Sequence, residues 1–209
     1  MSENQVIACD QEEDNVVSSE NYFHETLTGS KITHFYLNGS IRNTSPWYYP
    51  ALQLFNTASP YDEIYFHLNT IGGALSESVQ LLNAINTCQG NVHLIVEGEC
   101  SSAGNILAFG GKYKSIQIND VSTFLFHTAA AGRYHRVDIA KAYLKGIEQW
   151  SNLINRQCYK GILTEEELTQ LEEGAEIHLL APEIKSRLAA RDNGGESSDT
   201  KKKSFKKES

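Results

Sequence analysis

A serine and a histidine are the side chains of this sequence best suited to act as a nucleophile and its base. Ser102 lies in the small-residue segment 98–104, and His127 follows the apolar residues 124–126. A serine hydroxyl is a weak nucleophile unless a base lies within hydrogen-bond reach, and histidine most often serves as that base. The pair therefore predicts a hydrolase that works through an acyl-enzyme intermediate.

Two predicted elements place Ser102 where a strand is followed by a helix. Residues 92–96 are short, β-branched and apolar, as in a buried strand. Residues 105–109 are mostly apolar and are followed by Gly110, which is typical of a helix end. Backbone N–H groups at a helix N-terminus have no partner within the helix and can stabilise an oxyanion. This junction therefore suits a nucleophile.

A glycine pair occupies a second predicted junction of the same kind. Gly72 and Gly73 follow the alternating strand 64–68 and precede a helix over residues 75–85, whose apolar positions share one face. Because glycine has no side chain, the pair can direct backbone N–H groups into open space, as an anion or an oxyanion requires. The pair alone indicates only a turn.

Two known motifs are excluded by single residues. The nucleophile elbow of the α/β-hydrolases, G-x-S-x-G, would need glycine where Cys100 stands. A phosphate-binding loop in residues 110–115 would need Ser or Thr where Tyr113 stands, so we expect this chain to bind no ATP and no other cofactor. The cysteines contain no C-x-x-C pair, and we expect no metal site.

Taken in order, these motifs closely resemble the Clp protease proteolytic subunit family, ClpP. The resemblance rests on the glycine pair, the Gly-x-x-x-Ser-x-Gly pattern of residues 98–104, the histidine spacing and residues 179–183 (Leu-Leu-Ala-Pro-Glu), and it covers residues 31–190. It implies an α/β fold of stacked strand-strand-helix (ββα) units, shared with the crotonases. It also implies a protruding helix at the interface between rings. Residues 138–160 fit that helix, because they carry an apolar stripe at helical spacing.

By position, the resemblance makes Ser102 the nucleophile and His127 the general base. It also makes the backbone N–H groups of Gly73 and Ala103 the oxyanion hole. The family usually has methionine where Ala103 stands, but an oxyanion hole needs only the backbone N–H of that residue. No catalytic group is therefore lost, although the smaller side chain can reshape the pocket beside the scissile bond.

The third member of the predicted triad is a glutamate. Where the family has an aspartate, this sequence has Glu176, and glutamate can also orient a histidine and stabilise its charged form. Glu172 and Glu173 are the nearest alternatives. Residues 164–167 form a capping box, which predicts the start of a short helix that leads to Glu176.

Composition and charge agree with one compact enzyme domain. The 209 residues are 40% hydrophobic and 21% charged, which is enough to bury a sizeable core. We expect a protease domain over residues 31–190, between an acidic, mobile N-terminal segment 1–30 and a Lys-rich, disordered tail 191–209. The net charge of -8 argues against a nucleic-acid-binding body.

The sequence also bears on location. No apolar run approaches the ~20 residues that a membrane-spanning helix needs. The acidic N-terminus lacks the positive charge and apolar core of a secretion signal. We therefore expect a cytoplasmic protein without a membrane partner.

The predicted function is that of a ClpP-like serine endopeptidase with polypeptide substrates. The resemblance implies a homo-oligomer of stacked heptameric rings and a separate Clp-type ATPase unfoldase that uses ATP. The alternatives are a ClpP-like viral head-maturation protease, a catalytically weak structural or regulatory ring subunit, and a crotonase-like acyl-CoA enzyme. Retention of both Ser102 and His127 counts against the ring subunit, and missing CoA-binding signals count against the crotonase.

Overall fold

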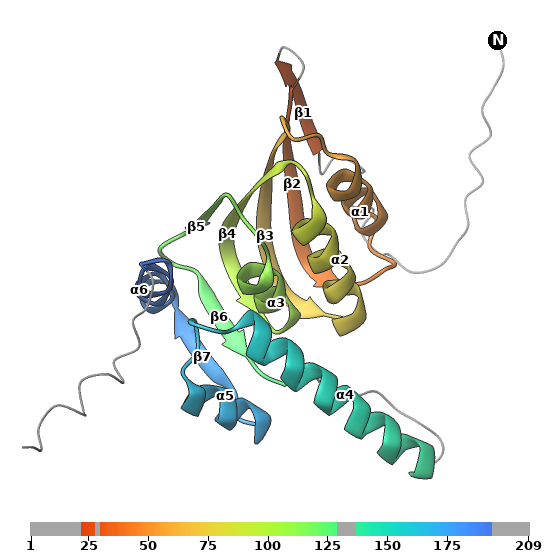
Figure 1. Cartoon of the computed structure of the whole chain (residues 1–209), viewed down its shortest axis with the longest axis vertical. Coiled ribbons are helices and arrows are strands. Elements are labelled where there is room, and N and C mark those ends of the chain that lie inside the picture. The colour runs from red at the N-terminus through yellow and green to blue at the C-terminus, as the bar shows by residue number, and fades with distance from the viewer. Residues whose placement is uncertain (1–21, 28–29, 129–136, 194–209) are drawn as a thin grey trace, which may run out of the picture.

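The computed structural model describes residues 22–27, 30–128 and 137–193 of the chain, which adopt an α/β fold (Figure 1). The predicted fold class is therefore confirmed. In chain order the elements are β1 (Tyr22–Leu27), β2 (Ser30–Ile41), α1 (Tyr48–Thr57), β3 (Glu63–Gly73), α2 (Leu75–Thr87), β4 (Asn91–Ser101), α3 (Ala103–Gly110), β5 (Ser115–Ile118), β6 (Thr123–Phe126), α4 (Val137–Cys158), α5 (Glu165–Glu172), β7 (Ile177–Leu180) and α6 (Ala181–Asp192).

The described strands form one sheet in the order β1-β2-β3-β4-β6-β7, with β5 also paired to β4. Strands β2, β3, β4 and β6 run parallel, whereas β1 and β7 are antiparallel to their neighbours. Parallel strands reach the same edge of a sheet with their carboxyl ends. The sheet therefore brings together the junctions that follow Gly73, Ser101 and Phe126.

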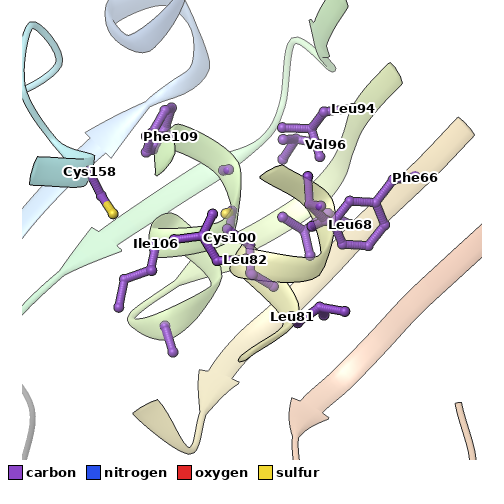
Figure 2. Packing of buried hydrophobic residues seen from close by; sticks show 14 of the residues in the cluster. Phe66, Leu68, Leu81, Leu82, Leu94, Val96, Cys100, Ile106, Phe109 and Cys158 are labelled. Atoms are coloured by element: carbon purple, nitrogen blue, oxygen red, sulfur yellow. The ribbon is translucent and has the colours of Figure 1, made fainter. Parts of the chain in front are cut away.

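The core lies between the sheet and the helices α1, α2 and α3, which cover one of its faces (Figure 1). Successive side chains of a strand point to opposite faces, so alternate apolar residues of β2, β3 and β4 meet these helices. Figure 2 shows this packing for Phe66, Leu68, Leu81, Leu82, Leu94, Val96, Ile106 and Phe109. Each fully buried leucine contributes about 1.5–3 kcal/mol relative to an exposed one.

The opposite face of the sheet carries stacked imidazole and phenol rings. The rings of His34 and Tyr65 stack with centroids 4.9 Å apart, and those of Tyr65 and His93 with centroids 4.8 Å apart. His34 Nδ1 lies 3.0 Å from His67 Nε2, and His67 Nδ1 lies 2.6 Å from Glu97 Oε1. Burial lowers the pKa of His34, and the neighbouring His67 lowers it further. These contacts connect β2, β3 and β4.

Described elements extend into both predicted terminal segments. Strand β1 lies within residues 1–30, which we expected to be mobile, and it pairs with β2 in an antiparallel register. Its sequence, Tyr-Phe-His-Glu-Thr-Leu, contains aromatic and β-branched residues that favour strands. Helix α6 also continues past residue 190, to Asp192. The remainder of the two predicted terminal segments, residues 1–21, 28–29 and 194–209, lies outside the described residues.

Arg187 of α6 joins three segments after the long helix α4. Its guanidinium donates to Glu167 of α5 at 2.6 and 2.8 Å, to Glu183 at 2.7 Å and to the carbonyl oxygen of Ile162 at 2.8 Å. The side chains of Arg187 and Glu167 are each only 20% exposed. A bidentate pair of this kind is stronger and more directional than a single surface ion pair. Arg187 therefore fixes α5 against α6.

We expect Arg187→Met to lower the free energy of unfolding by about 2 kcal/mol at pH 7, because Glu167 loses its charged partner while staying largely buried. The Arg187 hydrogen bonds hold the pKa of Glu167 below its ordinary value of 4.5. A lowered carboxyl pKa stabilises the fold at pH values above the ordinary pKa, and this contribution is lost as the pH falls below that pKa. The difference in free energy of unfolding between the unmodified protein and Arg187→Met, measured by urea unfolding, should therefore shrink between pH 6 and pH 3.

Arg191→Met on the same helix is the matched control for this measurement. Arg191 makes one longer ion pair, 3.3 Å, with Asp192, whose side chain is 68% exposed. Exposed pairs of this kind contribute at most about 1 kcal/mol. Equal losses of stability in the two variants would contradict a special role for Arg187.

Candidate active site

A pocket of about 310 Å³ lies at the sheet edge where β3, β4 and β6 end. Four of the five predicted site residues line it: Gly73, Ser102, Ala103 and His127. The remaining described walls come from the start of α2, from α3 and from the α4 region. The structure therefore brings a hydroxyl, an imidazole and two candidate N–H donors to one cavity.

Ser102 has an uncommon backbone conformation. It is the only described residue other than glycine with a positive φ, and its φ and ψ are 55° and -123°. It stands at the N-cap of α3, directly after β4, and its N–H donates to the carbonyl oxygen of Leu125 at 2.7 Å. Such a conformation costs about 1–3 kcal/mol and persists only where the surroundings impose it. Residues held in this way are frequent at active sites, which favours a chemical role for Ser102.

The glycine pair lets β3 approach the nucleophile turn closely. A Cβ atom on Gly72, whose φ is +89°, would lie 2.6 Å from the carbonyl oxygen of Ser101 and 2.7 Å from the Cβ of Ser102. A Cβ atom on Gly73 would lie 2.3 Å from the carbonyl oxygen of Ile41 on β2. Only glycine fits these distances without moving the backbone. The pair therefore sets the spacing between the predicted oxyanion hole and Ser102.

His127 has a defined tautomer in this structure. Its Nδ1 lies 2.7 Å from the carbonyl oxygen of Thr128. Because a carbonyl oxygen only accepts, Nδ1 carries the proton and Nε2 remains an acceptor in the neutral ring. An imidazole nitrogen without a proton is the group that a serine hydroxyl needs as its base. The ring is therefore in the protonation pattern of a general base.

Glu176 lies at the sheet end where His127 follows β6, but its side chain is not in the pocket. In the antiparallel pair of β6 and β7, the last paired residues are Phe126 and Ile177, so Glu176 directly precedes β7 where His127 directly follows β6. The Glu176 side chain is 64% exposed and its carboxylate lies 3.9 Å from His178 Nε2. It is absent from the described lining of the pocket. Among the alternatives, Glu172 is engaged in an ion pair with Arg156 at 2.5 Å.

Neither of the two residues before Ser102 is placed to act as a nucleophile. Cys100 is fully buried, and burial raises the pKa of its thiol far above the ordinary value, with the charge of Glu99 as a smaller cause. The hydroxyl of Ser101 is 2.8 Å from Glu99 Oε1, to which it donates, and Ser101 is only 3% exposed. A thiol that stays protonated is not a nucleophile. Ser102 is therefore the candidate nucleophile of this turn.

Asn105 is a positioning residue that the sequence did not single out. Its Nδ2 donates to the carbonyl oxygen of Leu125 at 2.7 Å, the same oxygen that accepts from the Ser102 N–H. Asn105 is fully buried, and its Oδ1 has no partner among the described residues. Both bonds tie the nucleophile turn to β6, two residues before His127. The available sequence signal was one amide in an otherwise apolar helix.

We expect Asn105→Leu to lower the rate at which Ser102 is acylated by about tenfold, because a small misplacement of reacting groups slows a reaction steeply. The free energy of unfolding should change by less than about 1 kcal/mol, since Leu125 keeps its bond to Ser102 and an unpaired buried oxygen is removed. Stopped-flow acylation and urea unfolding measure the two quantities. An unchanged acylation rate would contradict the positioning role.

Within the described ranges, no group of three or more His, Cys, Asp or Glu side chains could hold a metal ion. Among the helices of the described part, none is long and apolar enough to cross a membrane.

The chain was compared with models of known protein families and with curated proteins. A family model described as Clp protease matches residues 31–176, which is well over half of the chain. The matched range contains all the predicted site residues, from Gly73 to Glu176. None of the curated proteins with which the chain was compared matches it.

Proposed function

Since the chain belongs to the Clp protease family, we propose that it is a serine endopeptidase that uses Ser102 as nucleophile and His127 as general base. The observation that carries this proposal is the meeting of both side chains with Gly73 and Ala103 in one pocket. The strained backbone of Ser102 supports it independently, because a fold has no structural reason to keep a serine there.

The proposed reaction has two halves. His127 Nε2 takes the proton of Ser102 as the hydroxyl oxygen attacks the peptide carbonyl, and the backbone N–H groups of Gly73 and Ala103 bind the resulting oxyanion. The imidazolium then gives its proton to the leaving amine, which releases the first product. A water molecule repeats the sequence on the acyl-enzyme and frees Ser102. One oxyanion donor is worth about 10²–10³ in kcat.

Glu176 is the proposed third member of the triad. The pairing of β6 and β7 supports this role, because Phe126 pairs with Ile177 and their neighbours His127 and Glu176 leave the sheet at the same end. The role requires the carboxylate to leave His178 and adopt a rotamer that brings it to His127 Nδ1, and the 64% exposure of the Glu176 side chain leaves room for such a change. His127 Nδ1 would then exchange the Thr128 carbonyl for the carboxylate. That exchange stabilises the imidazolium formed during attack.

We further propose that the chain forms a ring-shaped oligomer and works with a Clp-type ATPase partner. Both are family expectations, and the expected assembly is a pair of stacked heptamers. Helix α4 supports an oligomeric state, because Tyr143, Leu144 and Leu153 are 42%, 44% and 64% exposed on it. Exposed large apolar side chains gathered on one element are typical of interaction surfaces. The ring size, the ATPase and the cytoplasmic location stay predictions.

A fluorophosphonate serine reagent tests the proposed function. The full-length protein should be labelled on Ser102, as located by peptide mass mapping, and Ser102→Ala should remove the label. Ser101→Ala is the matched control, since its hydroxyl is engaged by Glu99 and should not react. Absence of label on an assembled oligomer would contradict the active-protease proposal.

A structural or regulatory ring subunit is the second candidate function. The position of Glu176, turned toward His178 and away from the pocket, is the observation that favours it. The reagent separates the two candidates, because an unactivated serine reacts negligibly with fluorophosphonates.

A further inference from the structure

The pocket beside Ser102 has a polar wall on the long helix. Ser151 and Asn155 of α4 line the pocket, one helical turn apart and therefore on the same face. They are only 2% and 3% exposed. Buried polar side chains on the wall of a cavity are the groups that give a binding pocket its selectivity.

Asn155 is not satisfied within the described protein. Its Nδ2 is buried and has no hydrogen-bond partner among the described residues. Buried polar side-chain atoms are paired in the large majority of cases, so each exception calls for a cause. An unpaired amide in the wall of a pocket is satisfied when a ligand group with a hydrogen-bond acceptor enters.

The other described walls restrict the kind of ligand. Leu75, Ala103 and Ile106 are apolar, and Tyr159 contributes a buried ring. Burial raises the pKa of Tyr159 well above its ordinary value, so the phenol stays neutral. No Asp, Glu, Lys or Arg is among the described lining residues. A charged side chain would therefore be desolvated there without a counter-ion.

We propose that Asn155 is a specificity-determining residue that selects a carboxamide side chain, glutamine or asparagine, on the residue whose carbonyl Ser102 attacks. This inference rests on the proposed peptidase function. A carboxamide has an apolar stem for the Leu75 and Ile106 walls and a neutral head with both a donor and an acceptor. The unpaired Nδ2 of Asn155 can donate to the oxygen of such a carboxamide.

The preference for a carboxamide follows because a competing apolar side chain leaves the Asn155 amide unpaired. An apolar side chain of the same shape fills the pocket but leaves the Asn155 amide without a partner. A site with a buried polar group rejects an analogue that lacks the matching group more strongly than it rejects a change of size. The small Ala103 adds room beside Ser102 for the incoming side chain.

Peptidyl diphenyl phosphonates test this inference, because their second-order rate of Ser102 labelling depends on the side chain next to phosphorus. Two shape-matched pairs are compared on the full-length protein, glutamine with methionine and asparagine with leucine. We expect the carboxamide of at least one pair to react about tenfold or more faster than its apolar match. Equal rates, or faster reaction of both apolar members, would overturn the inference.

The variant Asn155→Leu tests whether Asn155 causes the carboxamide preference. We expect the rate ratio within the selective pair to fall to about one or to invert. Asn152→Leu is the matched control, because Asn152 lies on the same helix, has a buried amide oxygen without a partner among the described residues, and is outside the pocket lining. Its ratio should equal that of the unmodified protein. An unchanged ratio in Asn155→Leu would overturn the assignment.

Two outcomes separate this inference from the proposed function. Labelling of Ser102 by the fluorophosphonate together with no carboxamide preference leaves the peptidase standing and removes the role of Asn155. No labelling by either reagent contradicts the peptidase, and the inference with it. Should Asn155→Leu fail to fold, as judged by circular dichroism, the rate ratios of the unmodified protein and of Asn155→Asp still decide. The aspartate should abolish the carboxamide preference in favour of a lysine phosphonate.

Discussion

Replacing His127 with alanine is expected to lower kcat/KM for peptide hydrolysis by about 10⁴-fold or more, because the serine hydroxyl then loses the base proposed for it. His127 is the one imidazole in the described lining of the pocket, and its Nε2 is the atom left to accept a proton. The free energy of unfolding should change by less than about 1 kcal/mol, since the ring is only partly buried. Fluorogenic peptide hydrolysis and thermal unfolding measure the two effects.

His178→Ala is the matched control for this prediction. His178 lies on the neighbouring strand, faces Leu125 in the register and is 66% exposed. Its loss should leave hydrolysis unchanged. Glu176→Gln extends the series. If Glu176 is a member of the triad, removal of its charge should lower kcat/KM by a large part of the factor expected for His127→Ala. Hydrolysis by His127→Ala at more than a hundredth of the original rate would show that another group acts as the base.

Replacing Gly72 with alanine is the second change with a large expected effect. The new Cβ would come within 3 Å of backbone atoms of Ser101 and Ala103, which cannot move aside as a side chain could. We expect a loss of about 3 kcal/mol in the free energy of unfolding, from overpacking together with the positive φ. Acylation of Ser102 should fall by about 10²-fold, since displacement of the turn misplaces the hydroxyl.

Gly39→Ala separates the two causes of this loss. The φ of Gly39 is +82°, close to the +89° of Gly72, but an added Cβ would meet no atom within 4 Å. Gly39→Ala should therefore cost only the backbone term, about 1–2 kcal/mol, and should leave acylation unchanged. Equal effects of both substitutions on acylation would contradict the close-approach explanation.

Much of the sheet could be predicted from the local sequence. The strands predicted at residues 64–68 and 92–96 became the central parts of β3 and β4, because their alternate apolar residues can be buried against the helices on one face. The capping box at Thr164 is present with both of its reciprocal bonds, since it depends only on residues within one turn. β7 was not predicted, because its four residues become a strand only by pairing with β6.

The candidate site was predictable where the backbone determines it. The glycine pair and the Ser102 turn occur within short segments, and parallel pairing is enough to bring them together. The direction of the Glu176 side chain was not predictable, because it depends on torsions that an exposed strand end does not restrain. Asn105 and Asn155 also escaped prediction, since a buried amide becomes meaningful only once its surroundings are known.

The histidine row on the face opposite α1, α2 and α3 has hydrogen bonds with a fixed direction. A carboxylate only accepts, so the proton between Glu97 and His67 Nδ1 belongs to the imidazole, and the proton between the two rings then belongs to His34 Nδ1. The donors therefore point from β2 through β3 to β4, and the row is a directional side-chain bridge across three strands of the sheet.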